Sequence, residues 1–310
     1  MEEPAEQHGG HEIVLEDSSR KARVRKHDDV TLYHFPLSLD SQKVRLALAE
    51  KNVTWRSRVV NLIELENLEP WHMRLNPNGV VPTLVVDGKQ VTDSLQIARY
   101  INDEFPGHAL APLGEGGDRE MDSWMQRADS LPLRELTYAT LGGLAGRVAR
   151  RSLSRRGPAI EKQLKAHPDL AEQYAAKLEA HDSFKSSVGS NENLAAAKSE
   201  LEAAVNRLEQ RLKSHDWLVG ESYSLADIVW TPTLHRMSAL GFDELWKNGR
   251  RPAVEEYFSR MKERPSFKKA ISDFATTRQR LKVIAPRLVP MAVTATMAVA
   301  VLAAAAWLLT

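Results

Sequence analysis

The sequence predicts an α/β domain followed by an all-α domain, with a single transmembrane helix at the C-terminus. Three observations support this fold class. Short β-branched segments alternate with helical periodicity over residues 30–107, helical periodicity alone continues from about 118 to 275, and residues 288–310 carry no charged side chain. With 310 residues, the chain has room for roughly two domains with a real core.

The composition excludes several classes of function. The chain has 42 basic and 41 acidic residues, and its net charge of +1 gives no basis for a globally basic nucleic-acid binder. It has no cysteine, which excludes disulfides, thiolate metal sites, iron–sulfur clusters and a cysteine nucleophile. Its 10 histidines show no spacing typical of a metal site, so we expect no metal cofactor.

Residues 1–29 are expected to form a disordered N-terminal segment. They begin acidic, turn basic and contain only one short apolar run, from Ile13 to Leu15. A secretory signal has a basic start and a long apolar core, and an import presequence is poor in acidic residues. The segment therefore predicts no N-terminal targeting signal.

Residues 30–107 have the element order of a thioredoxin-like module. Turn residues at 76–79 precede the third strand, and Asp87-Gly88 is a hairpin signal before the fourth. The expected strands are 30–35, about 55–60, 83–86 and 90–92, and the expected helices are 42–51 and 94–104. This order, β-α-β-(α)-β-β-α, predicts one mixed sheet with helices packed on it.

Four short motifs make the prediction more specific. They are Ser38-Leu39-Asp40-Ser41 followed by Lys43-Val44-Arg45, Val81-Pro82 before a strand, Asp93-Ser94 before a helix, and Ser224-Leu225-Ala226-Asp227. With these motifs, residues 30–107 resemble the N-terminal domain of the glutathione transferase superfamily. The resemblance covers about residues 30–287 and points to the branch with the ganglioside-induced differentiation-associated protein 1 family and the plant tetrachlorohydroquinone-dehalogenase-like proteins.

The resemblance implies an α/β thioredoxin-like N-terminal domain that binds glutathione and an all-α C-terminal glutathione-transferase domain. Glutathione is then the co-substrate and a homodimer is a further expectation. Because the chain has no cysteine, the sulfur chemistry must come from glutathione itself.

Ser38 and Ser41 are the candidate catalytic residues. They lie between the first strand and the following helix, where backbone N–H groups and the helix dipole favour an anion. A serine there cannot form a mixed disulfide, but its hydroxyl can donate a hydrogen bond to the glutathione sulfur and lower the pKa of that thiol. The resemblance assigns this role to Ser38 first and Ser41 second. The alternative is that either serine only caps the helix.

Val81, Pro82, Asp93 and Ser94 are the candidate glutathione-binding residues. The resemblance implies a cis bond at Val81-Pro82, with the Val81 backbone paired to the cysteinyl part of glutathione. It also implies that Ser94 holds the γ-glutamyl carboxylate while Asp93 accepts from the ammonium group. An ordinary helix N-cap explains Asp93 and Ser94 equally well.

The second domain is expected over residues 118–275. Ser224 to Asp227 reads as a capping box that begins its central helix. A basic insertion at about 142–193 makes this domain longer than a minimal transferase. It carries Arg147, Arg150, Arg151, Arg155 and Arg156. With a membrane anchor in the same chain, this cluster at 147–156 favours anionic lipid or a protein partner over RNA, and a plain solvated insertion is favoured over both.

The C-terminal residues predict a tail anchor. Residues 276–287 form a basic juxtamembrane segment, and the 23 uncharged residues 288–310 are long enough as a helix to cross about 30 Å of hydrocarbon. The basic flank predicts that the protein faces the cytosol. The moderate hydrophobicity of the span favours the mitochondrial outer membrane over the endoplasmic reticulum, and a buried C-terminal helix is the alternative.

Two functional hypotheses follow. The first is a membrane-anchored glutathione S-transferase-like protein that activates glutathione through a serine for attack on an apolar electrophile. The second is a transferase-derived factor with little or no turnover that acts in mitochondrial outer-membrane dynamics or redox signalling. The motifs at Ser38, Pro82 and Ser94 favour the first, and the anchor and the basic insertion favour the second.

Overall fold

The computed structural model describes residues 27–111, 115–188 and 191–272. Its N-terminal domain contains a four-stranded sheet in the order β2-β1-β3-β4. The strands are β1 (Val30–His34), β2 (Arg56–Val59), β3 (Thr83–Val86) and β4 (Lys89–Thr92). β1 is parallel to β2 and antiparallel to β3, and β3 is antiparallel to β4. This mixed sheet confirms the predicted thioredoxin-like arrangement.

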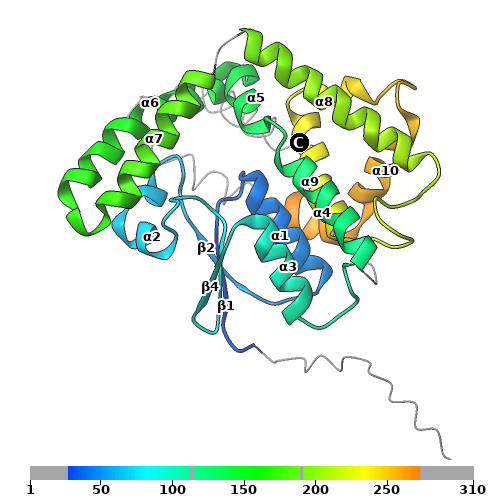
Figure 1. Ribbon diagram of the computed structural model, residues 1–310, viewed down its shortest axis with the longest axis horizontal. Helices are drawn as coiled ribbons and strands as arrows, with labels where there is room; N and C mark the ends of the chain where they lie inside the picture. The colour runs from blue at the N-terminus through cyan, green and yellow to red at the C-terminus, as the bar shows by residue number, and fades with distance from the viewer. Residues whose placement is uncertain (1–26, 112–114, 189–190, 273–310) are drawn as a thin grey trace, which may run out of the picture.

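Three helices complete this domain. They are α1 (Leu39–Glu50), α2 (Pro70–Leu75), which follows a 3-10 turn at Glu66–Leu68, and α3 (Ser94–Glu104). α1 and α3 lie side by side and face the all-α domain, whereas α2 lies away from them (Figure 1). Leu46 of α1, Leu84 of β3 and Ile97 of α3 have no exposed surface, so sheet and helices share one core.

The second domain is built from helices throughout its described residues. They are α4 (Glu115–Asp129), α5 (Leu133–Thr140), α6 (Gly143–Ala166), α7 (Ala171–Ser187), α8 (Asn191–Leu212), α9 (Leu225–Ala239), α10 (Pro252–Glu263) and the short α11 (Pro265–Phe267), with 3-10 turns at Pro168–Leu170 and Phe242–Leu245 and a π-helical turn at Lys268–Ser272. α9 is buried along most of its length and packs against both α1 and α4. It is the helix through which the two domains share their core.

The start of α9 confirms the predicted capping box. The Asp227 carboxylate accepts hydrogen bonds from the backbone N–H of Ser224 at 2.8 Å and from its hydroxyl at 2.9 Å. It also accepts from the Leu218 N–H at 3.1 Å and from the Tyr257 hydroxyl at 2.8 Å. These four bonds satisfy a fully buried carboxylate and fix where α9 begins.

The predicted basic insertion forms a packed pair of helices. α6 and α7 lie side by side next to α2 (Figure 1). The Tyr174 hydroxyl of α7 donates to the Leu68 carbonyl at 2.8 Å, and the ion pair of Arg74 with Asp169 spans 2.6 Å. A small buried cluster lies beneath the pair, formed by Leu65, Leu68, Met73, Ile160, Leu170 and Tyr174. The insertion is therefore docked on the N-terminal domain rather than fully solvated.

The predicted transmembrane helix is corrected by the structure. Within residues 27–111, 115–188 and 191–272, no helix combines the length and the apolar character needed to cross a bilayer. The longest helices, α6 with 24 residues and α8 with 22, carry charged side chains along their length. The strongly apolar α9 has only 15 residues, about 22 Å against a hydrocarbon core of about 30 Å.

For the described chain, the transmembrane helix and the tail-anchored localisation at the mitochondrial outer membrane were wrong predictions. The segments on which they depended, residues 276–287 and 288–310, lie outside the described residues. The expected N-terminal segment 1–29 also lies outside them, apart from its last three residues.

A buried ion pair joins α1 to the end of the second domain. The Glu50 carboxylate accepts two hydrogen bonds from the Arg264 guanidinium, both 2.8 Å long, and a third from the Ser266 hydroxyl. The Glu50 side chain is only 5% exposed, so its charge depends on these partners. The Arg264 guanidinium also lies 3.8 Å from the ring centroid of Tyr223.

Replacing Glu50 with glutamine should lower the free energy of unfolding by about 2 to 3 kcal/mol, because Arg264 loses its charged partner in a buried site. Urea denaturation at neutral pH measures this change. Glu256→Gln is the matched control, since its pair with Arg260 is exposed and should contribute no more than about 0.5 kcal/mol. Equal losses in the two variants would contradict a buried interdomain pair.

Candidate functional site

A cavity of about 700 Å³ lies between the two domains. The loops that follow β1 and β2 and the loop before β3 line it from the N-terminal domain. The end of α4 and helices α5, α6, α7 and α9 line it from the other side. The volume is within the range of about 300 to 1,000 Å³ that is typical of small-molecule sites. Of the predicted site residues, Ser38 and Val81 line this cavity.

The structure separates the two candidate serines. Ser38 is the N-cap of α1, is half-buried and lines the cavity. Its oxygen accepts a hydrogen bond from the Ser41 N–H at 3.2 Å, which leaves the hydroxyl proton free to donate. Ser41 is fully buried, its oxygen accepts from the Phe35 N–H at 3.3 Å, and it is not part of the cavity wall. Ser38 therefore caps α1, Ser41 bonds the loop before it, and Ser38 alone of the two reaches the cavity.

A buried arginine holds the loop that carries Ser38. Arg45 donates to the Pro36 carbonyl at 3.0 Å and to the Ala270 carbonyl at 2.9 Å. The neighbouring His34 is uncharged at neutral pH, because burial and the positive charge of Arg45 lower the pKa of His34 to about 3. Arg45 therefore ties the β1–α1 loop both to α1 and to the end of the second domain.

The loop before β3 forms a second wall of the cavity. The Val81-Pro82 bond is cis, as the resemblance implied, and Val81 lines the cavity whereas Pro82 does not. Asn67 donates to the Gly79 carbonyl at 2.7 Å. A Cβ at Gly79 would lie 2.7 Å from the Met73 sulfur, and its φ of +55° also favours glycine. Close packing thus fixes the backbone next to Val81.

Asp93 and Ser94 do not line the cavity. One Asp93 oxygen accepts from the Leu95 and Gln96 N–H groups, both at 3.0 Å, so Asp93 caps α3. The buried Ser94 hydroxyl donates to an Asp40 oxygen at 3.5 Å. The alternative of a helix N-cap therefore describes Asp93 in this structure, and Ser94 is connected to the cavity through Asp40.

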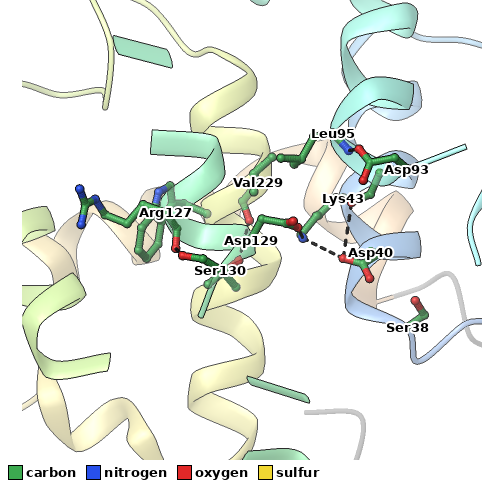
Figure 2. Close-up of polar contacts among 12 residues, drawn as sticks. Ser38, Asp40, Lys43, Asp93, Leu95, Arg127, Asp129, Ser130 and Val229 are labelled. Carbon is green, nitrogen blue, oxygen red and sulfur yellow. Dashed lines mark hydrogen bonds and ion pairs between the residues drawn. The ribbon is translucent and has the colours of Figure 1, made fainter. Parts of the chain in front are cut away.

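A charge cluster around the buried Lys43 lies next to Ser38 (Figure 2). The Lys43 ammonium is 2.8 Å from an Asp40 oxygen and 2.5 Å from an Asp129 oxygen, and its side chain is only 1% exposed. Burial by itself lowers the pKa of Lys43, but the two carboxylates together outweigh burial and raise the pKa above its usual value. Lys43 therefore stays charged and bridges α1 to the end of α4.

Sequence reasoning missed this cluster. Lys43 and Asp129 are 86 positions apart, and no local pattern pairs them. Asp40 lay within the first motif, and its position three residues before Lys43 on one helix face was the only local signal.

Three cations from the inserted region and its neighbour line the far side of the cavity. They are Arg134 of α5, Arg156 of α6 and Lys177 of α7, which we call the cationic wall. Burial and the charges of Arg156 and Arg134 lower the pKa of Lys177 to about 7. The predicted arginine cluster is divided, because Arg156 lines the cavity while its other four members are exposed.

In comparisons with known proteins, part of each domain matches a protein family. Residues 38–104 match the family described as "Glutathione S-transferase, N-terminal domain", and residues 191–260 match "Glutathione S-transferase, C-terminal domain". The intervening residues 105–190, which include the cationic wall, lie outside both matches.

Two curated relatives span most of the chain. "Ganglioside-induced differentiation-associated protein 1-like 1" of Homo sapiens is 30% identical over 280 residues, with 81% of this chain and 76% of the relative covered. "Tetrachloro-P-hydroquinone reductive dehalogenase" of Sphingobium chlorophenolicum is 31% identical over 246 residues, with 78% and 95% covered.

Solved structures share the fold. The beta-etherase LigF from Sphingobium sp. strain SYK-6 superposes with a TM-score of 0.60 at 24% identity and covers 78% of this chain and 98% of its own. The glutathione transferase URE2P8 from Phanerochaete chrysosporium, crystallised with oxidized glutathione, has a TM-score of 0.54 at 19% identity, with 79% and 95% covered.

A double-mutant cycle tests the bridge between α1 and α4. Lys43→Met should lower the free energy of unfolding by about 3 kcal/mol at pH 7, because the charge-assisted hydrogen bonds of the buried ammonium to Asp40 and Asp129 are lost. Because the pKa of Lys43 is raised in the folded protein, the stabilisation by Lys43 is fully present below about pH 10.5. It disappears only as the pH rises past the folded-state pKa of Lys43. In an Asp129→Asn background the loss should be smaller, with a coupling energy of about 1 to 3 kcal/mol from denaturation curves.

The exposed Lys165 of α6 supplies the control for this cycle. Lys165→Met should change the free energy of unfolding by no more than about 0.5 kcal/mol. Additive effects of Lys43→Met and Asp129→Asn would contradict a direct bridge.

Proposed function

The chain belongs to the glutathione S-transferase family, and we propose that it binds glutathione in the interdomain cavity and activates the thiol through Ser38. The observation that carries this proposal is the position of Ser38. It caps the N-terminus of α1, lines the cavity and keeps a hydroxyl proton free to donate. The same cavity is bounded by Val81, whose backbone we propose pairs with the cysteinyl part of glutathione.

The chemistry at Ser38 is thiolate stabilisation. The Ser38 hydroxyl donates to the glutathione sulfur, and the N-terminus of α1 adds a favourable dipole. Both effects favour the thiolate over the thiol and so lower the thiol pKa. The thiolate is then the nucleophile, which agrees with a chain that has no cysteine of its own.

The second substrate is an electrophile with apolar surface. Leu62, Ile63, Leu133, Leu141 and Val148 line the cavity together with Tyr138. In the reaction we propose, the sulfur forms a bond to an electrophilic carbon and a leaving group such as halide departs. The relative named a reductive dehalogenase supports halogenated aromatic compounds as a class to test.

A second candidate function is a transferase-derived factor with little or no turnover and weak affinity for glutathione, for example in redox signalling. Asp40 favours it, because its carboxylate lies 3.5 Å from the Ser94 hydroxyl, where we expect the γ-glutamyl carboxylate. Two carboxylates at one position repel each other. Lys43 offsets this repulsion through its ion pair with Asp40. The affinity for glutathione separates the two candidates.

Calorimetry of the full chain with millimolar glutathione should show saturable heat, and the same ligand should raise the midpoint of thermal unfolding. Ophthalmic acid, which has a methyl group in place of the thiol, should also bind because the peptide contacts remain. No heat and no thermal shift with either ligand would contradict the proposed function.

Ser38→Ala should raise the pKa of the bound glutathione thiol by roughly one unit or more, the equivalent of one hydrogen bond to a charged group. Ultraviolet absorbance of the thiolate against pH measures this value. Ser130→Ala is the matched control, since Ser130 lines the same cavity from the other domain and bonds the Arg127 carbonyl. An unchanged thiol pKa in Ser38→Ala would move the activating role to another group.

A further inference from the structure

We infer that the cationic wall of Arg134, Arg156 and Lys177 binds a carboxylate on the second substrate. This inference rests on the proposed function and specifies its substrate class as an apolar electrophile that carries a negative charge. The apolar side chains of the cavity accept the body of such a molecule, and the cationic wall accepts its acidic end.

The charge balance of the cavity is the first argument. Five basic and three acidic side chains line it. Two of the acidic groups, Asp40 and Asp129, are already paired with Lys43. Over residues 27–111, 115–188 and 191–272, no member of the cationic wall forms an ion pair. Among the same residues, the third acidic group, Glu135 of α5, acts on Arg134 electrostatically without forming an ion pair. The far side of the cavity therefore has three basic side chains against one carboxylate, an excess of positive charge.

Arg156 provides the second argument. Its Nε atom is buried and has no hydrogen-bond partner among the described residues. A buried donor without a partner destabilises the folded protein. A carboxylate in the cavity would accept from this guanidinium and satisfy the donor.

Contacts with neighbouring groups position the other two members of the cationic wall, Lys177 and Arg134. The Lys177 ammonium donates one hydrogen bond to the Asn78 carbonyl at 2.6 Å, which leaves further donors for a ligand. The Arg134 guanidinium lies 3.7 Å from the ring centroid of Phe184, which positions it by stacking. Burial and, after it, the charges of Arg156 and Arg134 lower the pKa of Lys177, and a bound anion would offset the repulsion among the three cations.

The position of the wall favours the second substrate over glutathione as the source of the carboxylate. The residues proposed for glutathione, Ser38 and Val81, belong to the N-terminal domain, whereas the wall comes from α5, α6 and α7. α5 and α6 also supply Leu133, Tyr138 and Val148, so apolar and cationic groups line one side together. This combination matches an acid with an apolar body.

A pair of aromatic chlorides tests the inference. 4-Chloro-3-nitrobenzoate carries the carboxylate, and 4-chloro-3-nitrobenzamide is its neutral counterpart. With either probe, the glutathione thiolate attacks the carbon that bears chlorine, a C–S bond forms, the C–Cl bond breaks and chloride leaves with its electron pair. The thiol proton goes to solvent. The two probes differ in charge while the bonds formed and broken are the same.

The measured quantity is the ratio of kcat/KM for the benzoate to kcat/KM for the benzamide, using the full chain. Arg156→Gln and Lys177→Gln should each reduce this ratio about tenfold or more, as expected when a charged hydrogen bond is lost. Arg155→Gln and Lys185→Gln are the matched controls, because these exposed cations lie on the same two helices outside the cavity. They should leave the ratio unchanged.

An equal loss for both probes would overturn the inference, because the wall would then act on glutathione or on the fold. An unchanged ratio in both variants would overturn it as well. Binding of unreactive 3-nitrobenzoate and 3-nitrobenzamide, measured by calorimetry without glutathione, tests the wall independently of turnover. If the wild type turns over neither chloride, the proposed function fails, and a preference for 3-nitrobenzoate that Arg156→Gln abolishes still supports the wall. The absence of that preference would overturn it.

Discussion

Helix α1 carries three charged side chains whose partners lie in the all-α domain. Lys43 pairs with Asp129, Arg45 donates to the Ala270 carbonyl, and Glu50 pairs with Arg264. Charges taken out of water require partners at hydrogen-bond distance, so these contacts fix α1 against the second domain. Because Ser38 caps α1, the position of the candidate thiol-activating group depends on the interdomain contacts as much as on the sheet.

The cavity combines two kinds of surface from two parts of the chain. The N-terminal domain supplies a helix N-terminus and a rigid loop, which suit a peptide with a thiol. The second domain supplies apolar side chains and the cationic wall, which suit an acid with an apolar body. Neither part encloses the cavity alone, so the proposed reaction places two substrates at one boundary between domains.

Local elements of the fold could be predicted from the sequence, and contacts between distant residues could not. β3 and α3 begin and end where the sequence predicted, because turn residues and caps mark their limits. α1 begins three residues earlier than expected, since Leu39 to Ser41 carry no helical periodicity. The motifs ranked Ser38 ahead of Ser41, and of the two only Ser38 lines the cavity. The role of Asp93 and Ser94 toward glutathione stays a prediction, since neither residue is part of the cavity wall. Lys43 with Asp129, and Arg156 with Lys177, meet only through tertiary packing.

The small hydrophobic cluster beneath α6 and α7 is separate from the core that joins the two domains. Ile160, Leu170 and Tyr174 anchor the inserted helices without contributing to the packing of α1 on α9. The same cluster contains Met73, whose sulfur packs against Gly79 in the loop that leads to Val81. A substitution in the inserted helices therefore acts on that loop through a shared partner, so the two sides of the cavity should change together rather than independently.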